Sequence, residues 1–490
     1  MYSFSYMYMR EDPFQTRFHW ILLSFVASIN LLIFSGSVFF LFIGWDGLGI
    51  TSFALIIYYQ RQESLRAGFQ TLIINRIGDA LIVFSTFLFV ILGQFTHMTL
   101  PDNQWVFFLV LTLIFAGLTK RAQYPFRSWL PAAMAAPTPV RALVHSSTLV
   151  TAGIFLIIRL RYWIPLSDEG CKVLLFCGSV TCLLGGWAAT YENDIKKIIA
   201  LSTLSQLGVI VFCLGLSLPS LALFHLYTHA LFKALLFIAA GHVLMATFGS
   251  QDIRLLGGIG LLIPFTSVIF AVSRFCLIGA PFLSAFYSKH LILEKILIGG
   301  PFPLFRVLLI IVATFFTAKY VSRRVKCVLW SKSECVILSK SNSLAIILPI
   351  SFLSLGSIIR GKLIYLADLS NLEIAYIPST LGMVINYVTI AGIVLGLTSW
   401  GGQRKSFLLS TIFFLTPIVA KGGVLLSPLI SKISSLDHGW LEPAVLLKRR
   451  VRKTGSFLTS LFRWPRKGFS TTRGVLVFTI LTTIVFTLNF

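Results

Sequence analysis

The chain consists of long apolar runs separated by short polar segments, and the runs recur from residue 18 to the end. An apolar helix of about 20 residues can cross the hydrocarbon core of a bilayer. We place membrane spans at 18–35, 37–59, 67–94, 105–120, 137–160, 171–190, 195–216, 219–247, 258–282, 302–326, 342–358, 375–398, 407–427 and 474–490. This is an upper count, because 105–120 and 342–358 are short and Pro417 interrupts 407–427. The pattern predicts an all-α polytopic membrane protein.

Composition and charge agree with membrane insertion. The 490 residues are 56% hydrophobic, which excludes an ordinary soluble globular class. The formal net charge is +24, but the excess lies in short loops and near the C-terminus, so we expect anionic lipid as a partner and no nucleic acid. Alternate loops are rich in Lys and Arg, whereas 95–104 and 217–220 have none, and 160–172 and 283–301 carry both signs. The basic-rich side is therefore predicted to face the matrix or cytoplasm.

Two spans look discontinuous, and each has a lysine beside its break. One ends at Lys120 and resumes near Trp129, and the other is interrupted at Gly279 to Pro281 and resumes toward Lys289. Broken helices at corresponding positions of two halves indicate a transport site in membrane carriers. We therefore expect an ion or proton pathway near these two lysines.

Three titratable residues share one face of the predicted helix 219–247. His225, His229 and Lys233 are spaced i, i+4 and i+8, so their side chains project from the same side. Two histidines at this spacing could hold a metal, although no carboxylate adjoins them, or they could be buried groups bonded to neighbouring carbonyls. A proton relay fits best, because imidazole titrates near neutrality and a desolvated lysine releases its proton more readily. Metal binding is not expected.

Further charged groups lie inside the spans 37–59, 67–94 and 137–160. Asp46 is flanked by glycines at mid-span, and a carboxylate there must be paired, protonated or hydrated. We predict that its partner is Lys120, either as a switching pair or as a fixed structural one. Arg76 and Asp79 are spaced i, i+3 and are predicted to pair locally in a structural or gating role. His145 lies about two turns into a long apolar helix that follows two prolines.

The helix predicted at 195–216 begins with charges and continues with small polar residues. Asp194 suits a helix start, because a negative charge there is favoured by the helix dipole. Lys197 could reach inward toward a pathway, or it could anchor the helix at the membrane boundary. The polar residues at 202–206 could line a hydrated stripe or bond neighbouring helices.

The C-terminal region is basic and aromatic rather than continuously apolar. Residues 428–473 predict an amphipathic helix at the membrane interface, or alternatively a solvated linker, before a final span at 474–490. The residues expected to bind anionic lipid, such as cardiolipin, are Lys448, Arg449, Arg450, Arg452, Lys453, Arg463, Arg466 and Lys467.

Several sequence blocks resemble one known family. They are FIGWDGLGITSF, INRIGD, KRAQYPFRSWLPAAMAAPTPVRALVHSSTLV, NDIKKIIALSTLSQLG, FHLYTHALFKALLF and APFLSAFYSKH, which occur in the family's order. They look like the antiporter-like membrane subunits of mitochondrial NADH:ubiquinone oxidoreductase, respiratory complex I. The tail SSLDHGWLEPAVLLKRR resembles the lateral helix of the family's longest, distal member.

The resemblance implies a domain organisation and a location. It implies two inverted five-helix repeats with broken helices at 1–160 and 161–326, further spans at 327–427, a lateral helix at 428–473 and a terminal anchor at 474–490. It also implies a multi-pass protein of the mitochondrial inner membrane, next to the antiporter-like subunit 4. The NADH, FMN, iron–sulfur and ubiquinone sites would belong to other subunits, so this chain is expected to have no redox centre and to bind no cofactor.

By motif position, the resemblance implies a proton-translocating axis. Its residues would be Asp46, Lys120, His145, His225, His229, Lys233 and Lys289, with Arg76, Asp79, Asp194, Lys197 and His290 in gating or structural roles. Two alternatives remain: a subunit of a related multisubunit Na⁺/H⁺ antiporter, and a scaffold subunit of complex I that no longer pumps.

The chain departs from the family pattern at several positions. Asp46 replaces a glutamate, Ala135 replaces the acid before the P-T-P motif, and Arg127 with Ser128 replaces His-Pro. His290 stands where the family has an aspartate after the lysine, which leaves Lys289 without an adjacent carboxylate. The first residues match the family's fourth helix, so its earlier helices are expected to be lost or carried by another chain.

Overall fold

The computed structural model describes residues 2–91, 104–163, 167–298, 304–332, 344–367 and 379–398, and a few positions between 424 and 480. Within these segments the chain is helical, apart from an isolated bridge between Asp194 and Asp252. The helices are α1 (Tyr2–Tyr8), α2 (Gln15–Phe34), α3 (Val38–Ile56), η1 (Ile57–Tyr59), α4 (Gln62–Ile91), α5 (Gln104–Lys120), α6 (Trp129–Ala132), η2 (Ala133–Ala135), α7 (Thr138–Val140), η3 (Arg141–Thr148), α8 (Leu149–Trp163), α9 (Asp168–Tyr191), α10 (Ile195–Gly215), α11 (Pro219–Ala246), α12 (Ile259–Leu262), α13 (Pro264–Ile278), α14 (Ser284–Ile298), α15 (Leu304–Val325), η4 (Lys326–Trp330), α16 (Leu344–Ala367) and α17 (Ser379–Thr398). The all-α polytopic class is confirmed.

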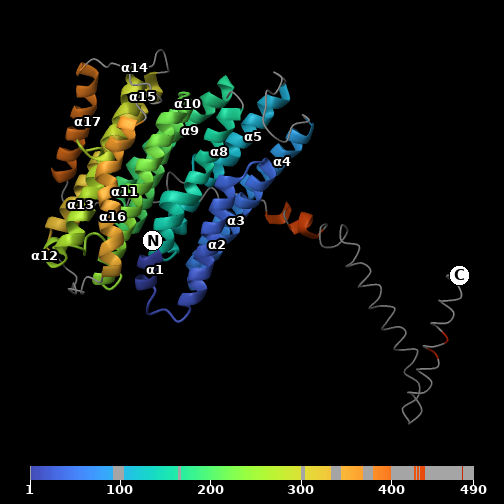
Figure 1. The fold of residues 1–490 in the computed structure, drawn as a ribbon, viewed down its shortest axis with the longest axis horizontal. Coiled ribbons are helices and arrows are strands. Elements are labelled where there is room, and N and C mark those ends of the chain that lie inside the picture. Colours follow the sequence, from blue (N-terminus) through green and yellow to red (C-terminus); the bar gives the residue numbers. More distant parts are fainter. Residues whose placement is uncertain are drawn as a thin grey trace, which may run out of the picture. The chain divides into compact units, whose positions relative to one another are not determined.

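The chain divides into two compact units, Met1–Leu415 and Thr416–Phe490. In the first unit the long helices lie side by side as a bundle, with α4 and α5 at one end and α17 at the other (Figure 1). Eight helical segments among the described residues are long and apolar enough to cross a membrane. In the second unit the described residues 431–435 are helical. The predicted lateral helix at 428–473 and the spans at 407–427 and 474–490 lie almost entirely outside the described residues.

Most predicted spans coincide with helices to within a few residues, but α16 is longer than predicted. The expected span 342–358 stops before two cations, whereas the helix continues to Ala367. Arg360 and Lys362 are exposed on its surface, so neither charge has to enter the bundle interior. A charge therefore marked the edge of the apolar run without marking the end of the helix.

The centre of the bundle is α10, in which every residue of its membrane-crossing window is buried. It packs closely on α9 because glycines face each other across the contact. A Cβ at Gly178 of α9 would lie 2.7 Å from the Phe212 amide nitrogen, and a Cβ at Gly208 of α10 would lie 2.7 Å from that of Cys182. Small residues allow the helix backbones of membrane proteins to approach in this way.

Both predicted helix breaks are present. The α5 helix ends at Lys120, and α6 begins at Trp129. The α13 helix ends at Ile278, where Gly279 adopts a left-handed conformation with φ of 91°, and α14 begins at Ser284. A residue with a Cβ disfavours this φ, so glycine is suited to the second break. The helix after the first break also contains a π-helical turn, η3, and such turns occur frequently at functional sites.

Candidate functional site

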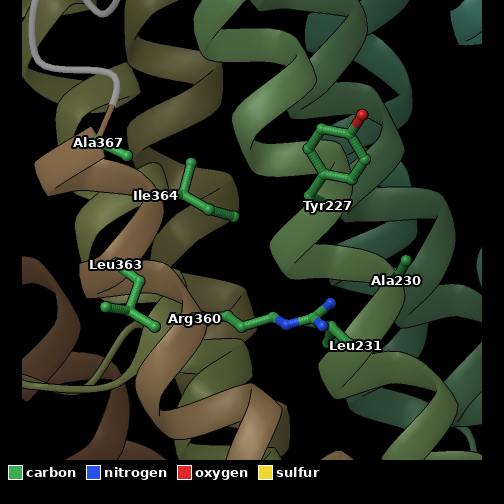
Figure 2. Close-up of a pocket in the computed structure, with 7 residues that line it drawn as sticks. All are labelled: Tyr227, Ala230, Leu231, Arg360, Leu363, Ile364 and Ala367. Carbon is green, nitrogen blue, oxygen red and sulfur yellow. The ribbon is translucent and has the colours of Figure 1, made fainter.

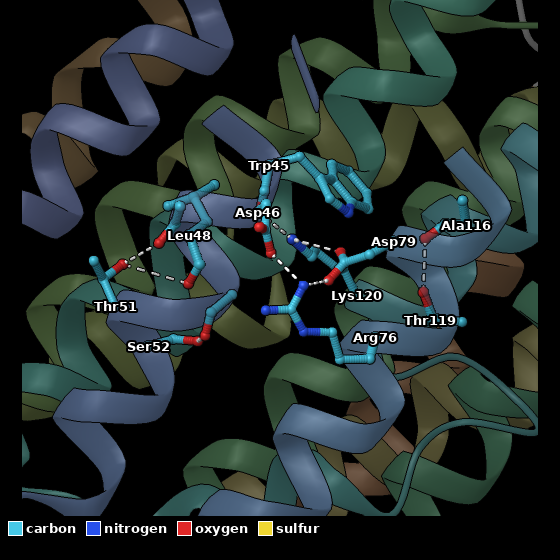
Figure 3. Close-up of polar contacts among 12 residues, drawn as sticks. Trp45, Asp46, Leu48, Thr51, Ser52, Arg76, Asp79, Ala116, Thr119 and Lys120 are labelled. Atoms are coloured by element: carbon cyan, nitrogen blue, oxygen red, sulfur yellow. Dashed lines mark hydrogen bonds and ion pairs between the residues drawn. The ribbon is translucent and has the colours of Figure 1, made fainter. Parts of the chain in front are cut away.

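Four charged side chains from three neighbouring helices form a chain of alternating charge in the first half of the bundle (Figure 3). Asp46 lies on α3, Arg76 and Asp79 lie on α4, and Lys120 ends α5. Arg76 Nη1 is 2.8 Å from Asp46 Oδ1 and 3.5 Å from Asp79 Oδ2. Asp79 Oδ1 is in turn 3.8 Å from Lys120 Nζ. Arg76 therefore bridges the two carboxylates, and Asp79 lies between two cations.

The predicted ion pair between Asp46 and Lys120 is wrong. Asp46 binds Arg76, and the acid within ion-pairing distance of Lys120 is Asp79. The reason is the position of α4, which packs against both α3 and α5: its Arg76 reaches Asp46 on α3, and its Asp79 reaches Lys120 on α5. The predicted local pair between Arg76 and Asp79 is confirmed.

The network runs from the surface of the bundle into its interior. The exposed fraction of the side chain falls from 49% for Arg76 and 28% for Asp46 to 6% for Asp79 and 0% for Lys120. At the inner end, Lys120 Nζ donates a hydrogen bond of 2.5 Å to the Trp45 carbonyl oxygen and lies 4.2 Å from the centre of the Trp45 ring. The buried ammonium is thus held by a carbonyl, an aromatic face and one carboxylate.

The second half contains the predicted column on α11, and all three of its residues are buried. The rings of His225 and His229 have centres 6.4 Å apart. His225 Nδ1 lies 2.9 Å from Ser288 Oγ on α14. Lys233 Nζ donates a hydrogen bond of 2.5 Å to Ser202 Oγ on α10. The column therefore connects to hydroxyl groups on two different neighbouring helices.

Several nitrogens of this column are buried and have no hydrogen-bond partner among the residues that the structure describes. They include Nε2 of His225 and both ring nitrogens of His229, and the side-chain amide of Gln206 on α10 is also unpaired. Buried polar atoms are rarely left unpaired, and ordered water commonly satisfies those that lack a protein partner. These atoms are suited to extend a hydrogen-bonded path beyond the side chains themselves.

The second break holds Lys289 in a polar environment. Lys289 Nζ donates to the Ile278 carbonyl oxygen, which the end of α13 leaves available, at 3.1 Å, and to Thr317 Oγ1 on α15 at 3.3 Å. His290 packs against Phe286, with ring centres 4.3 Å apart. Glu294, one turn further along α14, is half-buried and was not singled out from the sequence. No described carboxylate forms an ion pair with Lys289.

Reasoning from the sequence missed a polar face on α15. Thr317 accepts from Lys289, and Tyr320, one turn later, is buried. The Tyr320 hydroxyl lies close to Ser205 and Ser202 on α10, of which Ser202 also binds Lys233, although no hydrogen bond of normal geometry joins Tyr320 to either hydroxyl. The α15 face thus passes from the vicinity of one lysine to that of the other. The only signal in the sequence is the polar residues recurring at helical spacing within an apolar run.

The remaining predicted residues lie at the periphery or outside the description. Asp194 is the N-cap residue of α10 and pairs with Lys197 at 3.0 Å. Because the Lys197 side chain is half exposed, it lies at the boundary rather than reaching inward. The His145 backbone lies in η3, but its side chain is outside the described residues, as are the basic residues from Lys448 to Lys467.

Comparison with known proteins gives consistent matches. Residues 35–317 match the family model described as NADH:quinone oxidoreductase/Mrp antiporter, TM. NADH-ubiquinone oxidoreductase chain 5 of Artemia franciscana is 38% identical over 93% of this chain and 85% of its own length. The protein of the same name from Lumbricus terrestris is 45% identical over 74% of this chain, which spans 63% of that relative.

Solved structures share the fold. A chain of an Mrp complex from Dietzia matches 96% of this chain and 51% of its own length, with a TM-score of 0.63 and 22% identity. A chain of an archaeal membrane-bound sulfane sulfur reductase matches 78% of each chain, with a TM-score of 0.66 and 23% identity. At these identities the likeness concerns the fold alone.

The fold and the family match define an antiporter-like membrane subunit with charged groups buried inside its helical bundle. The chain belongs to the NADH:quinone oxidoreductase/Mrp antiporter family and, within it, to the chain 5 group of NADH-ubiquinone oxidoreductase. It is a multi-pass protein of the mitochondrial inner membrane.

Proposed function

We propose that this chain translocates protons as a membrane subunit of NADH:ubiquinone oxidoreductase, along an axis through Lys120, the α11 column and Lys289. The observation that carries the proposal is the burial of these titratable groups inside an apolar bundle. The three lysines and His225 each lie within hydrogen-bonding distance of a further polar atom. Ionisable groups at membrane depth are costly, and where they occur they mark ion or proton pathways.

In the first half, Asp79 acts as the shared element of a switch. It lies between Arg76 at 3.5 Å and Lys120 at 3.8 Å. At this distance and an effective dielectric constant near 20, the buried Lys120 stabilises the carboxylate by about 4 kcal/mol, whereas the half-exposed Arg76 contributes at most about 1 kcal/mol because solvent screens it. When Lys120 gives up its proton, this attraction is lost and Asp79 remains bound to Arg76. A change in the charge of Lys120 is thereby transmitted to the surface of the bundle, where Asp46 shares the same arginine.

In the second half, each of the two lysines donates to a hydroxyl group, and the Tyr320 hydroxyl is a candidate link between them. Lys233 donates to Ser202, Tyr320 lies beside Ser202, and Thr317 on the Tyr320 helix accepts from Lys289. Hydroxyl groups both donate and accept, so they can pass a proton without carrying a charge of their own. The histidines of α11 lie buried beside this route, and an imidazole ring can donate a hydrogen bond at one nitrogen and accept one at the other.

The half-exposed outer end of the network favours a protein neighbour. Arg76 and Asp46 retain exposure on a bundle surface where Ile43, Ile73 and Ile77 are also exposed. A charged pair facing hydrocarbon is costly, and a covering polar surface removes that cost. We infer that subunit 4 covers this face, and that the basic segment 448–467 contacts cardiolipin, as its composition predicts.

Replacement of Lys233 by methionine in the assembled complex tests the proposal. Proton pumping per NADH oxidised should fall, while NADH oxidation in uncoupled membranes and assembly of the complex persist. Lys172→Met is the matched control, because that lysine is exposed and pairs with Glu169. Undiminished pumping by Lys233→Met would support the scaffold alternative. Pumping that depends on Na⁺ would support the antiporter alternative.

A further inference from the structure

A groove of about 510 Å³ lies between α11 and α16 and is lined by none of the axis residues (Figure 2). Its walls are largely aliphatic, with Leu231 on α11 facing Leu363 and Ile364 on α16. Its polar groups come from two side chains, the guanidinium of Arg360 and the hydroxyl of Tyr227. This volume is within the range of sites that hold small amphiphilic molecules.

Arg360 occupies an unusual position for a cation. It lies seven residues before the end of α16 at Ala367, which places it about 10 Å along the helix axis from that end. The residues around it on the outer face, including Leu355 and Ile359, are apolar and exposed, as expected for a surface against lipid. Among the residues that the structure describes, Arg360 has no carboxylate or carbonyl partner. A cation at this depth requires a counter-charge or access to the interface.

The other side of the groove lies at a corresponding depth. Tyr227 is eight residues into α11, which begins at Pro219, so its Cα is about 12 Å along the helix axis from that end. The start of α11 and the end of α16 are therefore on the same side of the bundle. This is the side of loop 217–220, which carries no Lys or Arg. The groove consequently combines one cation and one hydroxyl near the interface with an apolar channel between the helices.

We propose that the groove binds an anionic phospholipid of the surrounding membrane. The phosphate pairs with the planar guanidinium of Arg360, which can offer two parallel N–H donors to phosphate oxygens. The Tyr227 hydroxyl donates to a phosphate or ester oxygen, and an acyl chain packs along Leu231, Leu363 and Ile364. A phospholipid matches both parts of the groove, whereas free phosphate matches only the arginine.

Lipid analysis of the purified complex tests this site. The complex carrying Arg360→Gln should retain one fewer anionic phospholipid, or hold it about tenfold more weakly, as expected for loss of a charge-assisted hydrogen bond. The matched control is Lys362→Gln, because that lysine is exposed on the same helix but does not line the groove. Native mass spectrometry after reconstitution into phosphatidylcholine nanodiscs, with and without cardiolipin, measures the retained lipid.

A second variant separates loss of the lipid from loss of folding. Leu363→Trp fills the apolar channel and leaves Arg360 in place, and it should displace the same lipid. Equal lipid retention by all variants would overturn the proposal. So would occupation of the groove by an acidic side chain of a neighbouring subunit in a structure of the assembled complex. The proposal would also be refuted if inorganic phosphate alone bound at Arg360 and no lipid were retained there.

Discussion

The Asp79→Asn variant tests the order of charges in the first half of the bundle most directly. The change removes the carboxylate that lies 3.8 Å from Lys120 and leaves the shape of the side chain almost unaltered. At an effective dielectric constant near 20, a pair at this distance is worth about 4 kcal/mol. Since 1.4 kcal/mol corresponds to a factor of ten, the charged form of Lys120 should become about a thousandfold less favourable.

The expected result is a complex that assembles and oxidises NADH in uncoupled membranes but pumps poorly. The assay is proton uptake into proteoliposomes per NADH oxidised, with assembly followed on native gels. Asp46→Asn is the matched control, because Asp46 pairs with the half-exposed Arg76 and such pairs contribute at most about 1 kcal/mol. If Asp46→Asn abolished pumping and Asp79→Asn did not, the direct pairing of Asp79 with Lys120 would have no functional weight.

Two further predictions concern the second half and the packing of the bundle. Tyr320→Phe removes only a hydroxyl and should slow the proton transfer that this hydroxyl serves by about a hundredfold. The measurement is protons pumped per NADH oxidised, compared with the control Tyr387→Phe, whose side chain is exposed. Equal proton-to-NADH ratios in the two variants would exclude the relay role. Gly208→Ala places a Cβ 2.7 Å from the Cys182 amide nitrogen and should destabilise the subunit by about 1–3 kcal/mol, as measured by thermal inactivation. The control Gly36→Ala should be neutral, because nothing lies within 4 Å of its new Cβ. Equal stability of the two variants would contradict the packing argument.

Helix positions could be predicted well from the apolar runs, because a bilayer requires about 20 consecutive apolar residues for each crossing. Both breaks were also predictable, since glycine and proline interrupt the runs beside Lys120 and Lys289. The length of α16 was not, because a charge can lie on an exposed helix face without ending the helix. Hydropathy measures the apolar run and does not measure where the backbone hydrogen bonding stops.

The candidate site was predictable only where its members share one helix. The i, i+4, i+8 spacing of His225, His229 and Lys233 determines a common face, and the structure buries all three together. Pairings between helices depend on which helix lies between which others, and no spacing in one chain encodes that order. For this reason the partner of Lys120 was predicted as Asp46 instead of Asp79, and the burial of Tyr320 near the polar residues of α10 was missed.

The complete enclosure of α10 has a consequence for how the protein is made. A membrane protein inserts its helices first and associates them afterwards, so α10 must at first meet lipid on every side. Its polar residues Ser202 and Gln206 are then turned toward hydrocarbon until α9 and α11 close around them. Biogenesis should therefore pass through a stage at which a chaperone or an already inserted neighbour shields this helix, and the last of its neighbours to arrive completes the subunit.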